Sequence, residues 1–361
     1  MRIAHTPPRY APHIGGVEAV DRVVCEHSLR AGDEVVVLCA DVPRGGPARV
    51  AGVPVRRLRW NRTVANTQLT LGLPRALWRE EWDVVHTHLP TPWSADVSVL
   101  VARLRGRRSV VHFHNPIVGD GAAGRIAALY RRTAQRVTLR LADAVIAISA
   151  TRRDELVAGQ PSLAGKVHLV PNGVDLERFR PATATRTTDL LFVSVLDDFH
   201  DYKGLSVLLQ ALVDVRDRVL RVVGDGSSRS RWEKEAADLG VAERVVFEGA
   251  VSDERLRDLY QRCGAFVLPS RTAHHEGGSS LVALEAMACG LPVVLADGVG
   301  DLAQQAAEAG AGIRVPSNDV PALVAALRTV RPDMGPAARA HVEQHHSWEA
   351  ACRQITALYR R

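Results

Sequence analysis

The sequence predicts an α/β protein made of two doubly wound, Rossmann-like domains that face a cleft, and three observations lead to this prediction. The chain has 361 residues, which is long for one ordinary core. Short apolar runs alternate with longer amphipathic segments, as in repeated β-α-β units. The apolar runs are continuous rather than alternating, which is typical of parallel strands covered on both faces.

Nine of these runs are expected to form strands. They are residues 34–40, 83–88, 109–114 and 143–149 in the first half, and 190–196, 220–226, 244–249, 265–270 and 291–296 in the second. Helical patterns lie between them, for example over residues 17–32 and 204–215. Because parallel sheets bind ligands at the carboxyl ends of their strands, we expect the functional residues in the loops after these runs.

The domain boundary is expected at residues 180–189. This segment, RPATATRTTD, is polar, rich in threonine and poor in large apolar residues, as linkers are. We therefore predict an N-terminal domain over residues 1–182 and a C-terminal domain over residues 183–345.

The composition, with 46% hydrophobic and 24% charged residues, is that of a globular protein. No apolar run is long enough to span a membrane, and the N-terminus lacks an apolar signal core, so we expect a cytoplasmic protein. The five cysteines are scattered and form no CxxC pair, which indicates buried thiols rather than a zinc site or disulfides.

Charge is unevenly distributed along the chain. Residues 1–180 hold 26 Lys and Arg against 16 Asp and Glu, a balance of +10. Residues 181–361 hold 20 against 24, a balance of −4. A basic half favours an anionic partner such as a phosphate or a membrane surface, although arginine-rich codon usage explains it equally well. We expect no nucleic-acid partner.

The most informative stretch is HHEGGSSLVALEAMACGLPVV, residues 274–294. A helix is expected to begin after Ser279 or Ser280, and its free first-turn amides favour an anion. Gly277 and Gly278 allow a phosphate to approach the backbone. Glu285 lies just over one turn into the helix, where it suits ribose hydroxyls rather than a phosphate. Glu276, ahead of the turn, suits sugar hydroxyls, while an ordinary loop with solvated acids stays the alternative.

Two further glycine turns and two histidine pairs are candidates. Gly15 and Gly16 precede a helical pattern and are read as a second ligand-facing turn, or as a simple tight turn. Gly224 belongs to a Gly-Asp-Gly turn that does not match the dinucleotide fingerprint GxGxxG. The pairs His86/His88 and His112/His114 alternate at strand ends, but no carboxylate cluster accompanies them in the sequence, so we expect no metal site.

Several of these stretches, in this order, resemble the retaining GT-B glycosyltransferases of family 4 (group 1), which use nucleotide sugars. They are IGGVE (14–18), HFHNP (112–116), VPNGVDLERF (170–179), YKG (202–204), VVGDG (222–226), VVFEGAVSDERLRDLY (245–260), EGGSSLVALEAMACGLPVV (276–294) and SWEAACRQITALY (347–359). The resemblance implies an acceptor-binding N-terminal domain and a nucleotide-sugar-binding C-terminal domain. It also implies that a C-terminal helix over residues 346–361 packs back toward the N-terminal domain.

The resemblance also implies roles for individual residues. His114 would contact the transferred sugar, Lys203 would hold the diphosphate and Glu276 would orient the sugar. The full implied donor site is Gly15, Gly16, Lys203, Gly224, Glu248, Gly249, Glu276, Gly277, Gly278, Ser279, Ser280, Leu281 and Glu285. No cofactor or metal is implied beyond the nucleoside-diphosphate sugar, which is a UDP or GDP sugar, and the sequence contains no DxD triplet of the metal-dependent transferases.

Two features depart from the family pattern. Eight residues separate Glu276 from Glu285 where the family has seven, and Gly277 stands at the usual spacing. The family also carries an arginine after the first strand of its second domain, where this chain reads Ser194-Val195-Leu196. The diphosphate would then depend more on Lys203 and backbone amides, with His200 as a further donor.

The expected reaction transfers a sugar to an acceptor hydroxyl with retention, by front-face attack and without a metal. A nucleotide-sugar 2-epimerase and a non-catalytic nucleotide-sugar binder stay open as alternatives. The acceptor is a glycan, a lipid-linked glycan or a small natural product. Residues 124–141 are predicted to form one amphipathic helix whose basic face suits peripheral contact with an anionic membrane, as at the inner membrane face, or simple solvation.

Overall fold

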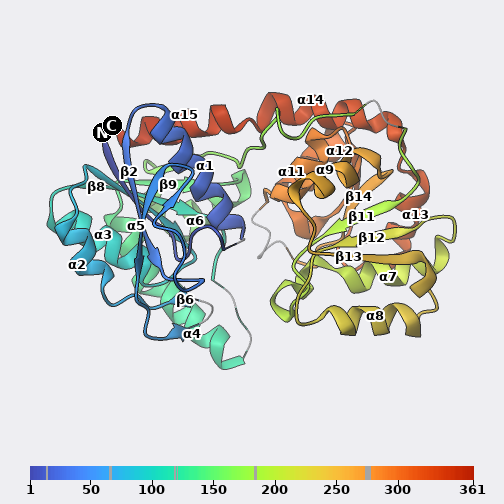
Figure 1. Ribbon diagram of the computed structural model, residues 1–361, viewed down its shortest axis with the longest axis horizontal. Coiled ribbons are helices and arrows are strands. Elements are labelled where there is room, and N and C mark those ends of the chain that lie inside the picture. The colour runs from blue at the N-terminus through green and yellow to red at the C-terminus, as the bar shows by residue number, and fades with distance from the viewer. Residues whose placement is uncertain (14, 65–66, 118, 120, 183–184, 273–277) are drawn as a thin grey trace. The chain divides into compact units, whose positions relative to one another are not determined.

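A computed structural model describes residues 1–13, 15–64, 67–117, 119, 121–182, 185–272 and 278–361 (Figure 1). The chain forms two compact units. Unit 1 comprises residues 1–171 and 348–361, and unit 2 comprises residues 172–347. The division therefore lies ahead of the expected boundary at 182/183. The reason is that Val174 and Phe179 are buried in the core of unit 2.

Unit 1 contains an eight-stranded sheet in the order β10-β9-β8-β7-β1-β2-β4-β3, parallel except for the β3–β4 pair. Its strands are β1 (Arg2–Thr6), β2 (Glu34–Ala40), β3 (Arg49–Val50), β4 (Val53–Leu58), β7 (Val84–Leu89), β8 (Arg108–Phe113), β9 (Ala144–Ala147) and β10 (Val167–Leu169). A separate ribbon pairs β5 (Thr63–Val64) with β6 (Thr67–Gln68).

Helices cover both faces of this sheet. They are α1 (Gly16–Arg30), α2 (Leu73–Arg79), α3 (Ser94–Leu104), α4 (Gly121–Arg132), α5 (Ala134–Leu141), α6 (Ala150–Gly159) and α15 (Trp348–Tyr359), with a 3₁₀ turn η1 (Pro161–Leu163). The C-terminal helix α15 packs beside α1 in unit 1 (Figure 1), where Cys352 and Ile355 join the core around Val24.

Unit 2 contains a six-stranded parallel sheet in the order β13-β12-β11-β14-β15-β16. The strands are β11 (Leu190–Val193), β12 (Leu220–Val223), β13 (Val245–Gly249), β14 (Ala265–Leu268), β15 (Val293–Ala296) and β16 (Gly312–Val315). The helices are α7 (Leu205–Asp214), α8 (Arg229–Asp238), α9 (Asp253–Arg262), α11 (Leu281–Ala288), α12 (Asp301–Glu308), α13 (Val320–Thr329) and α14 (Gly335–His345). The 3₁₀ turns are η2 (Asp198–Lys203), η3 (Ala242–Arg244), η4 (Asp297–Val299) and η5 (Pro332–Met334).

All nine predicted strands are present, but the sequence prediction missed β1, β3, β4, β5, β6, β10 and β16. Strand β1 is central in its sheet, between β7 and β2. Its five residues, RIAHT, contain only two apolar side chains, so they lack the continuous apolar run used to recognise the others. Strand β16, GIRV, was missed because an exposed arginine interrupts its apolar residues.

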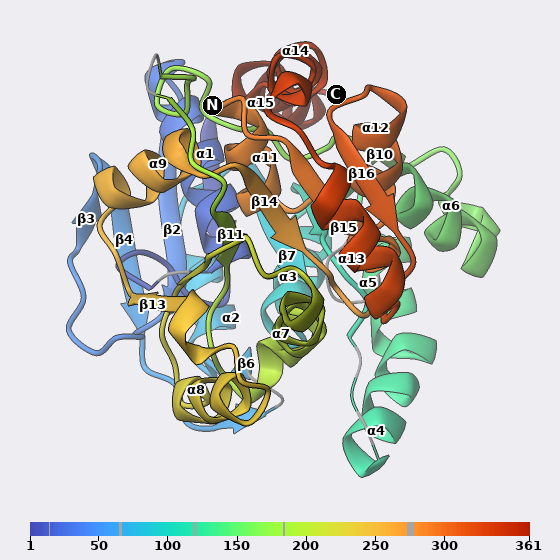
Figure 2. The same cartoon turned by 90° about the vertical axis from the view of Figure 1, so that its right-hand side faces the viewer.

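Residues 124–141 do not form the single helix that the sequence predicted. Thr133, with φ −121° and ψ −94°, interrupts it and separates α4 from α5. Helix α4 projects beyond the neighbouring elements of its unit in both views (Figure 1, Figure 2). As a result Ile126 and Leu129 are 67% and 64% exposed.

Candidate functional site

The first candidate site residues lie at the carboxyl ends of β11 and β14, which are paired neighbours in unit 2. The loop after β11 contains η2, which ends at Lys203. Gly204 follows with φ +82°, and a Cβ atom there would lie 2.1 Å from the Pro269 carbonyl oxygen. Glycine at this position therefore lets the Lys203 turn lie directly against the loop after β14.

A second cation lies on that neighbouring loop. The Arg271 amide donates to the Tyr202 carbonyl at 2.7 Å, and its guanidinium pairs with Asp201 at 2.9 Å. Lys203 and Arg271 thus come from two adjacent loops that are hydrogen-bonded to each other. The sequence reasoning missed Arg271 because only the pairing of β11 with β14 brings the two loops together.

The loop after β14 leads into α11, which begins at Leu281 after the N-cap residue Ser280. Ser279 and Ser280 are both 4% exposed. The Ser280 hydroxyl is buried and has no hydrogen-bond partner, and the first amides of any α-helix lack intrahelical acceptors. Gly278 has φ +84°, which favours glycine. The start of α11 therefore presents a row of unused donors, as an anion site requires.

Asn172 holds this turn in place from another part of unit 2. Its backbone amide donates to the Ser279 hydroxyl at 3.2 Å, and its side-chain amide donates to the Ser279 carbonyl at 2.9 Å. The Asn172 carbonyl in turn contacts His346 Nδ1 at 3.0 Å. Burial lowers the pKa of His346 to about 4, so this ring is neutral near pH 7 and donates from Nδ1. The His346 side chain is only 4% exposed, in keeping with this role.

Glu285 lies one turn into α11, as the sequence predicted. The Tyr260 hydroxyl, on α9, donates to Glu285 Oε2 at 3.0 Å. Burial raises the pKa of Glu285 to about 7, against the opposite effects of the Tyr260 hydrogen bond and of Arg178. Near neutral pH this carboxyl is therefore divided between its acid and its carboxylate, and a ligand that needs an acceptor would favour the carboxylate.

Gly224 and Gly249 serve the packing of strand ends. Gly224 has φ +125°, and a Cβ atom there would lie 1.7 Å from the Ser194 carbonyl oxygen. Its amide donates to the Gly249 carbonyl at 2.9 Å, and Gly249 has φ +72°. These contacts account for both glycines without a ligand, whereas the sequence interpretation had placed them in the donor site.

The side chain of Glu248 is committed to ion pairs. It lies 2.7 Å from Arg221 and 3.1 Å from Arg255. Burial alone would raise the pKa of this carboxyl, but the hydrogen bonds from the two arginines hold the pKa below its usual value. The resemblance places Glu248 in the donor site, and these ion pairs leave its backbone rather than its side chain for that role. Two other candidates, Glu276 and Gly277, lie outside the described residues, as do His274 and His275.

In unit 1 the candidates Gly15 and Gly16 begin α1, Gly15 as the N-cap residue and Gly16 as the first helical residue. A Cβ atom on Gly15 would lie 2.2 Å from Glu18 Oε2, while Gly16 has open space around it. Glu18 is 4% exposed and accepts from Arg9 Nε at 3.1 Å. The tight turn at Gly15 therefore makes room for the Glu18 carboxylate.

His114 belongs to a layer of imidazole rings on the face of the unit 1 sheet that α1 and α15 cover. The rings are His5, His86, His88, His112 and His114, which neighbouring strands stack at centroid distances of 4.4–5.5 Å. Because side chains alternate along a strand, His86 and His88 lie on one face of β7, and His112 lies on the same face of the sheet in β8. Burial lowers the pKa of His114 well below its usual value, and the nearby His88 ring lowers it further.

Asp21, on α1, lies at the centre of this layer, and the sequence reasoning missed it. Its Oδ1 atom is 2.7 Å from His5 Nδ1 and 2.7 Å from His88 Nε2. Burial alone would raise the pKa of Asp21, but the two imidazoles hold it below its usual range. No sequence signal linked Asp21 to the histidines, because helix packing alone brings α1 onto strands β1 and β7.

Two groups in this layer have enough ligand atoms to hold a metal ion, namely His86/His88/His112 and His5/Asp21/Cys25. In the first group both nitrogens of His88 are already engaged, by Asp21 and by His114. The His88 and His112 rings are stacked with an interplanar angle of 20°, which directs their in-plane lone pairs side by side rather than at one point. This geometry favours hydrogen bonding within the layer over tetrahedral coordination.

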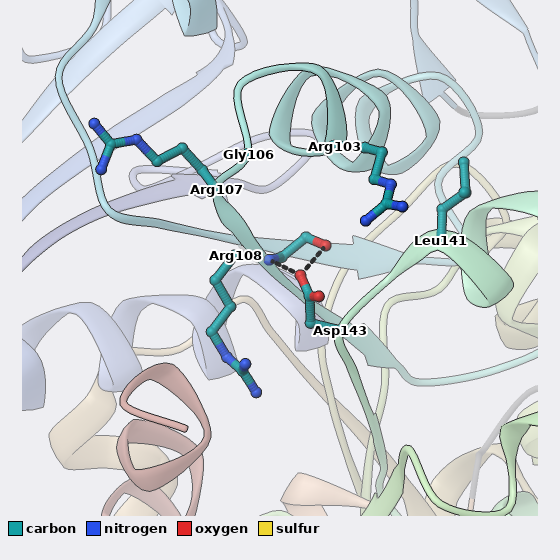
Figure 3. Close-up of a pocket in the computed structure, with 7 residues that line it drawn as sticks. Arg103, Gly106, Arg107, Arg108, Leu141 and Asp143 are labelled. Atoms are coloured by element: carbon teal, nitrogen blue, oxygen red, sulfur yellow. Dashed lines mark hydrogen bonds between the residues drawn. The ribbon is translucent and has the colours of Figure 1, made fainter.

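A cavity of about 280 Å³ in unit 1 does not contain any of the predicted site residues (Figure 3). It lies near the start of β8, where Asp143 accepts from the Ser109 amide at 2.8 Å. Arg103, Arg107 and Arg108 line it but point in different directions in Figure 3. The carboxyl ends of the strands, where His114 lies, are at the opposite edge of the sheet.

The chain matches two family models along most of its length. The model described as Glycosyltransferase Family 4 matches residues 14–178, and the model described as Glycosyl transferases group 1 matches residues 175–346. Among the described residues, none of the helices combines the length and apolar character needed to cross a membrane.

Curated relatives agree with the family models. The chain is 30% identical to D-inositol 3-phosphate glycosyltransferase 1 of Catenulispora acidiphila, over 95% of this chain and 82% of the relative. It is also 30% identical to the GDP-mannose:cellobiosyl-diphosphopolyprenol alpha-mannosyltransferase of Xanthomonas oryzae, over 87% of this chain and 83% of the relative.

Solved structures share the fold. Sucrose-phosphate synthase from Thermosynechococcus elongatus aligns with a TM-score of 0.79 at 22% identity, covering 99% of this chain and 98% of that one. The Anabaena protein HepE in complex with UDP-glucose aligns with a TM-score of 0.78 at 19% identity, with the same coverage. The fold is therefore GT-B, and the chain belongs to the group 1, family 4 glycosyltransferases.

Proposed function

We propose that this protein is a retaining glycosyltransferase that moves a hexosyl group from a UDP or GDP sugar to an acceptor hydroxyl, giving an α-glycoside. The start of α11 carries this proposal. The buried, unpartnered Ser280 hydroxyl and the first amides of α11 precede Glu285 by one turn. The hydroxyl and the amides can donate hydrogen bonds to a pyrophosphate, and the nearby Glu285 carboxylate can accept them from the hydroxyls of the attached ribose.

The diphosphate needs positive charge that the missing family arginine does not supply. Val195 stands in the middle of the Ser194-Val195-Leu196 triplet and is 44% exposed. We propose that Lys203 and Arg271, on adjacent loops, jointly provide this charge. The Arg271–Asp201 pair is 46% exposed on the arginine side, so water already competes for it and a phosphate can replace it at low cost.

The chemistry follows from this arrangement. Charge develops on the leaving diphosphate as the glycosidic bond breaks, and Lys203 with the amides from Ser280 onward would stabilise it. The acceptor hydroxyl attacks from the same face, and the leaving diphosphate takes its proton. No protein nucleophile, cofactor or metal is assigned to this path. Glu276 would orient the sugar, Glu285 the ribose, and His114 a hydroxyl of the transferred sugar.

We further propose that the acceptor carries a phosphate. Residues 1–180 hold 26 Lys and Arg against 16 Asp and Glu, which favours an anionic ligand in the N-terminal half. The names of two relatives point the same way, because one acts on an inositol 3-phosphate and the other on a diphosphopolyprenol-linked glycan. A phosphorylated polyol and a lipid-diphosphate-linked glycan are thus the two acceptor types to test.

The test is a donor screen by calorimetry and slow hydrolysis with UDP-glucose, GDP-mannose and dTDP-glucose. We expect one donor to bind and to be hydrolysed, and both signals to weaken in Glu285→Ala and Lys203→Ala. Glu233→Gln and Lys234→Ala are the matched controls, since both residues lie exposed on α8. Absence of binding by any nucleotide sugar would contradict the proposal.

The same screen separates the alternatives. A 2-epimerase would release the donor sugar as its 2-epimer or convert one nucleotide sugar into another, which NMR of the products detects. A non-catalytic binder would bind a donor tightly but turn over none, with either acceptor type present. Formation of an α-anomeric product from an added phosphorylated polyol or lipid-linked glycan would establish the transferase.

We also propose peripheral contact with an anionic membrane, through a surface made by α2 and α3. Trp78, Leu100 and Leu104 on this surface are 50–66% exposed, and the exposed Arg75 and Arg79 line the same groove. Aromatic and aliphatic side chains next to arginines suit the boundary of an anionic bilayer. The basic helix proposed from the sequence is interrupted at Thr133, which leaves α4 as a smaller candidate surface.

A further inference from the structure

Three buried side chains of unit 1 form a continuous hydrogen-bonded chain that ends at His114. Asp21 Oδ1 lies 2.7 Å from His88 Nε2, and His88 Nδ1 lies 3.0 Å from His114 Nε2. The first two side chains are 0% exposed, and His114 is 5% exposed. Every ring nitrogen in the chain is therefore engaged except Nδ1 of His114, which ends it.

The positions of the hydrogens follow from Asp21. An ionised carboxylate only accepts hydrogen bonds, so each group facing Asp21 donates to it. The donors are His88 Nε2, His5 Nδ1 and, at 3.8 Å, the Cys25 thiol. Three donors satisfy the buried charge, and burial lowers the pKa of His114 well below its usual value, which favours a neutral ring at the end of the hydrogen-bonded chain.

A neutral His88 with hydrogen on Nε2 has a lone pair on Nδ1. The His114 nitrogen that faces it must then carry hydrogen, because two lone pairs do not bond. A neutral His114 with hydrogen on Nε2 has its lone pair on Nδ1. Asp21 thus determines whether His114 Nδ1 carries a hydrogen, although the two side chains are not in contact.

We propose that Asp21 and His88 are positioning residues that hold His114 as the Nε2–H tautomer, so that His114 Nδ1 accepts a hydrogen bond from a substrate hydroxyl. This inference rests on the proposed function, in which His114 contacts the transferred sugar. A histidine held in this tautomer favours a sugar with a hydroxyl group at the position facing Nδ1. It disfavours a sugar whose group at that position can only accept hydrogen bonds. The rest of the layer facing these three side chains is His5, His86, His112, Cys25, Tyr10 and Tyr359.

The first test needs no variant and no substrate. In uniformly ¹⁵N-histidine-labelled protein, two-bond ¹⁵N–¹H correlation spectra distinguish the two neutral tautomers and the imidazolium form. We expect Nε2–H for both His88 and His114 at pH 7.5, with signals assigned by His88→Gln and His114→Gln. An Nδ1–H tautomer of His114, or an imidazolium at His88, would overturn the proposal.

The second test uses Asp21→Asn, which keeps the shape but offers an amide in place of one carboxylate oxygen. The amide can keep its oxygen toward His88 and His5, which both face Oδ1 of Asp21, but it lacks the carboxylate charge. The preference of His88 for hydrogen on Nε2 therefore weakens, and the tautomer population of His114 shifts toward Nδ1–H. We expect kcat of donor hydrolysis to fall roughly 10- to 100-fold, as for other residues that act through a functional side chain. The matched control is Asp33→Asn, which changes a 6%-exposed carboxylate of unit 1 outside this chain and should retain activity.

A double-mutant cycle distinguishes positioning from general damage. If Asp21 acts through His114, then adding Asp21→Asn to His114→Ala lowers kcat little further. If the fold-losses in kcat of the two single variants multiply in the double variant, the proposal is contradicted. An unchanged His114 tautomer in folded Asp21→Asn would also contradict it. If the spectra show the expected tautomers but no nucleotide sugar is turned over, then the proposed function fails while the hydrogen-bonded chain stands.

Discussion

The Tyr260 hydroxyl donates a hydrogen bond to Glu285 Oε2 at 3.0 Å, from a ring that is fully buried. Among the described residues, this is the one side-chain hydrogen bond to Glu285, and burial raises the pKa of Glu285 to about 7. The carboxyl proposed to anchor the ribose therefore titrates in the physiological range. Donor binding and protein stability both acquire a pH dependence from this buried carboxyl.

Donor affinity should rise with pH through neutrality. Ribose hydroxyls donate to a carboxylate, so binding requires the ionised form of Glu285. We expect the dissociation constant of the nucleotide sugar to fall by about tenfold between pH 6 and pH 8, and to level off above pH 8. The diphosphate of a nucleotide sugar is a diester and does not titrate here. Calorimetry at several pH values measures this, and Glu285→Gln should bind weakly with no such trend.

The same group should weaken the fold as pH rises. A carboxyl whose pKa is raised on folding binds more protons in the folded state, so its contribution to stability is lost as pH rises through the folded pKa of about 7. Between pH 5 and pH 8 the wild type should lose up to about 3 kcal/mol of unfolding free energy relative to Glu285→Gln, which has no carboxyl at this position. Urea denaturation of both proteins at both pH values tests this, and a constant difference would contradict it.

The Asn172 side chain should matter for donor binding more than for folding. Asn172→Ala removes the hydrogen bond to the Ser279 carbonyl, which holds the turn before α11. We expect donor affinity to fall roughly tenfold, corresponding to about 1.4 kcal/mol. Asn172→Asp should be worse, because it loses the same donor and places a carboxylate beside the proposed pyrophosphate site. Equal affinities of the two variants would argue against an anion at the start of α11.

Gly224 should tolerate no side chain. Gly224→Ala would place a Cβ atom 1.7 Å from the Ser194 carbonyl oxygen at φ +125°, so the ends of β11 and β12 must separate. We expect a loss of at least about 3 kcal/mol of stability. Gly240→Ala is the control, since Gly240 also has positive φ (+69°) but open space around it, and should cost only about 1 kcal/mol. Urea unfolding of both variants makes the comparison.

Binding to anionic vesicles should depend on the surface formed by α2 and α3. We expect Trp78→Ser combined with Leu104→Ser to reduce co-sedimentation with phosphatidylglycerol-containing vesicles several-fold, and high salt to reduce it in the wild type. Val213→Ser, at an exposed position of unit 2, is the control. If only Ile126→Ser on α4 reduces binding, then α4 rather than α2 and α3 forms the contact. No salt-sensitive binding at all would remove the membrane proposal.

Local patterns in the sequence were enough to predict the α/β class, the nine continuous apolar strands, the helix after Ser280 and the position of Glu285 one turn into it. These features depend on local patterns, in which apolar periodicity and turn residues encode an element directly. The resemblance to the GT-B family added the roles of Lys203 and His114. Strand β1 escaped this reasoning because its polar residues, including His5, face a buried layer whose partners are far away in the sequence.

Which side chains contact one another could not be read from these patterns, because it depends on how the elements pack. The pairing of β11 with β14 brings Arg271 against the turn of Lys203, and the packing of α1 on the sheet brings Asp21 to His88. Asn172 reaches Ser279 across 107 positions of the chain. Such contacts depend on strand order and helix packing, which no local pattern specifies, and it is these contacts that set the charges and tautomers of the candidate site.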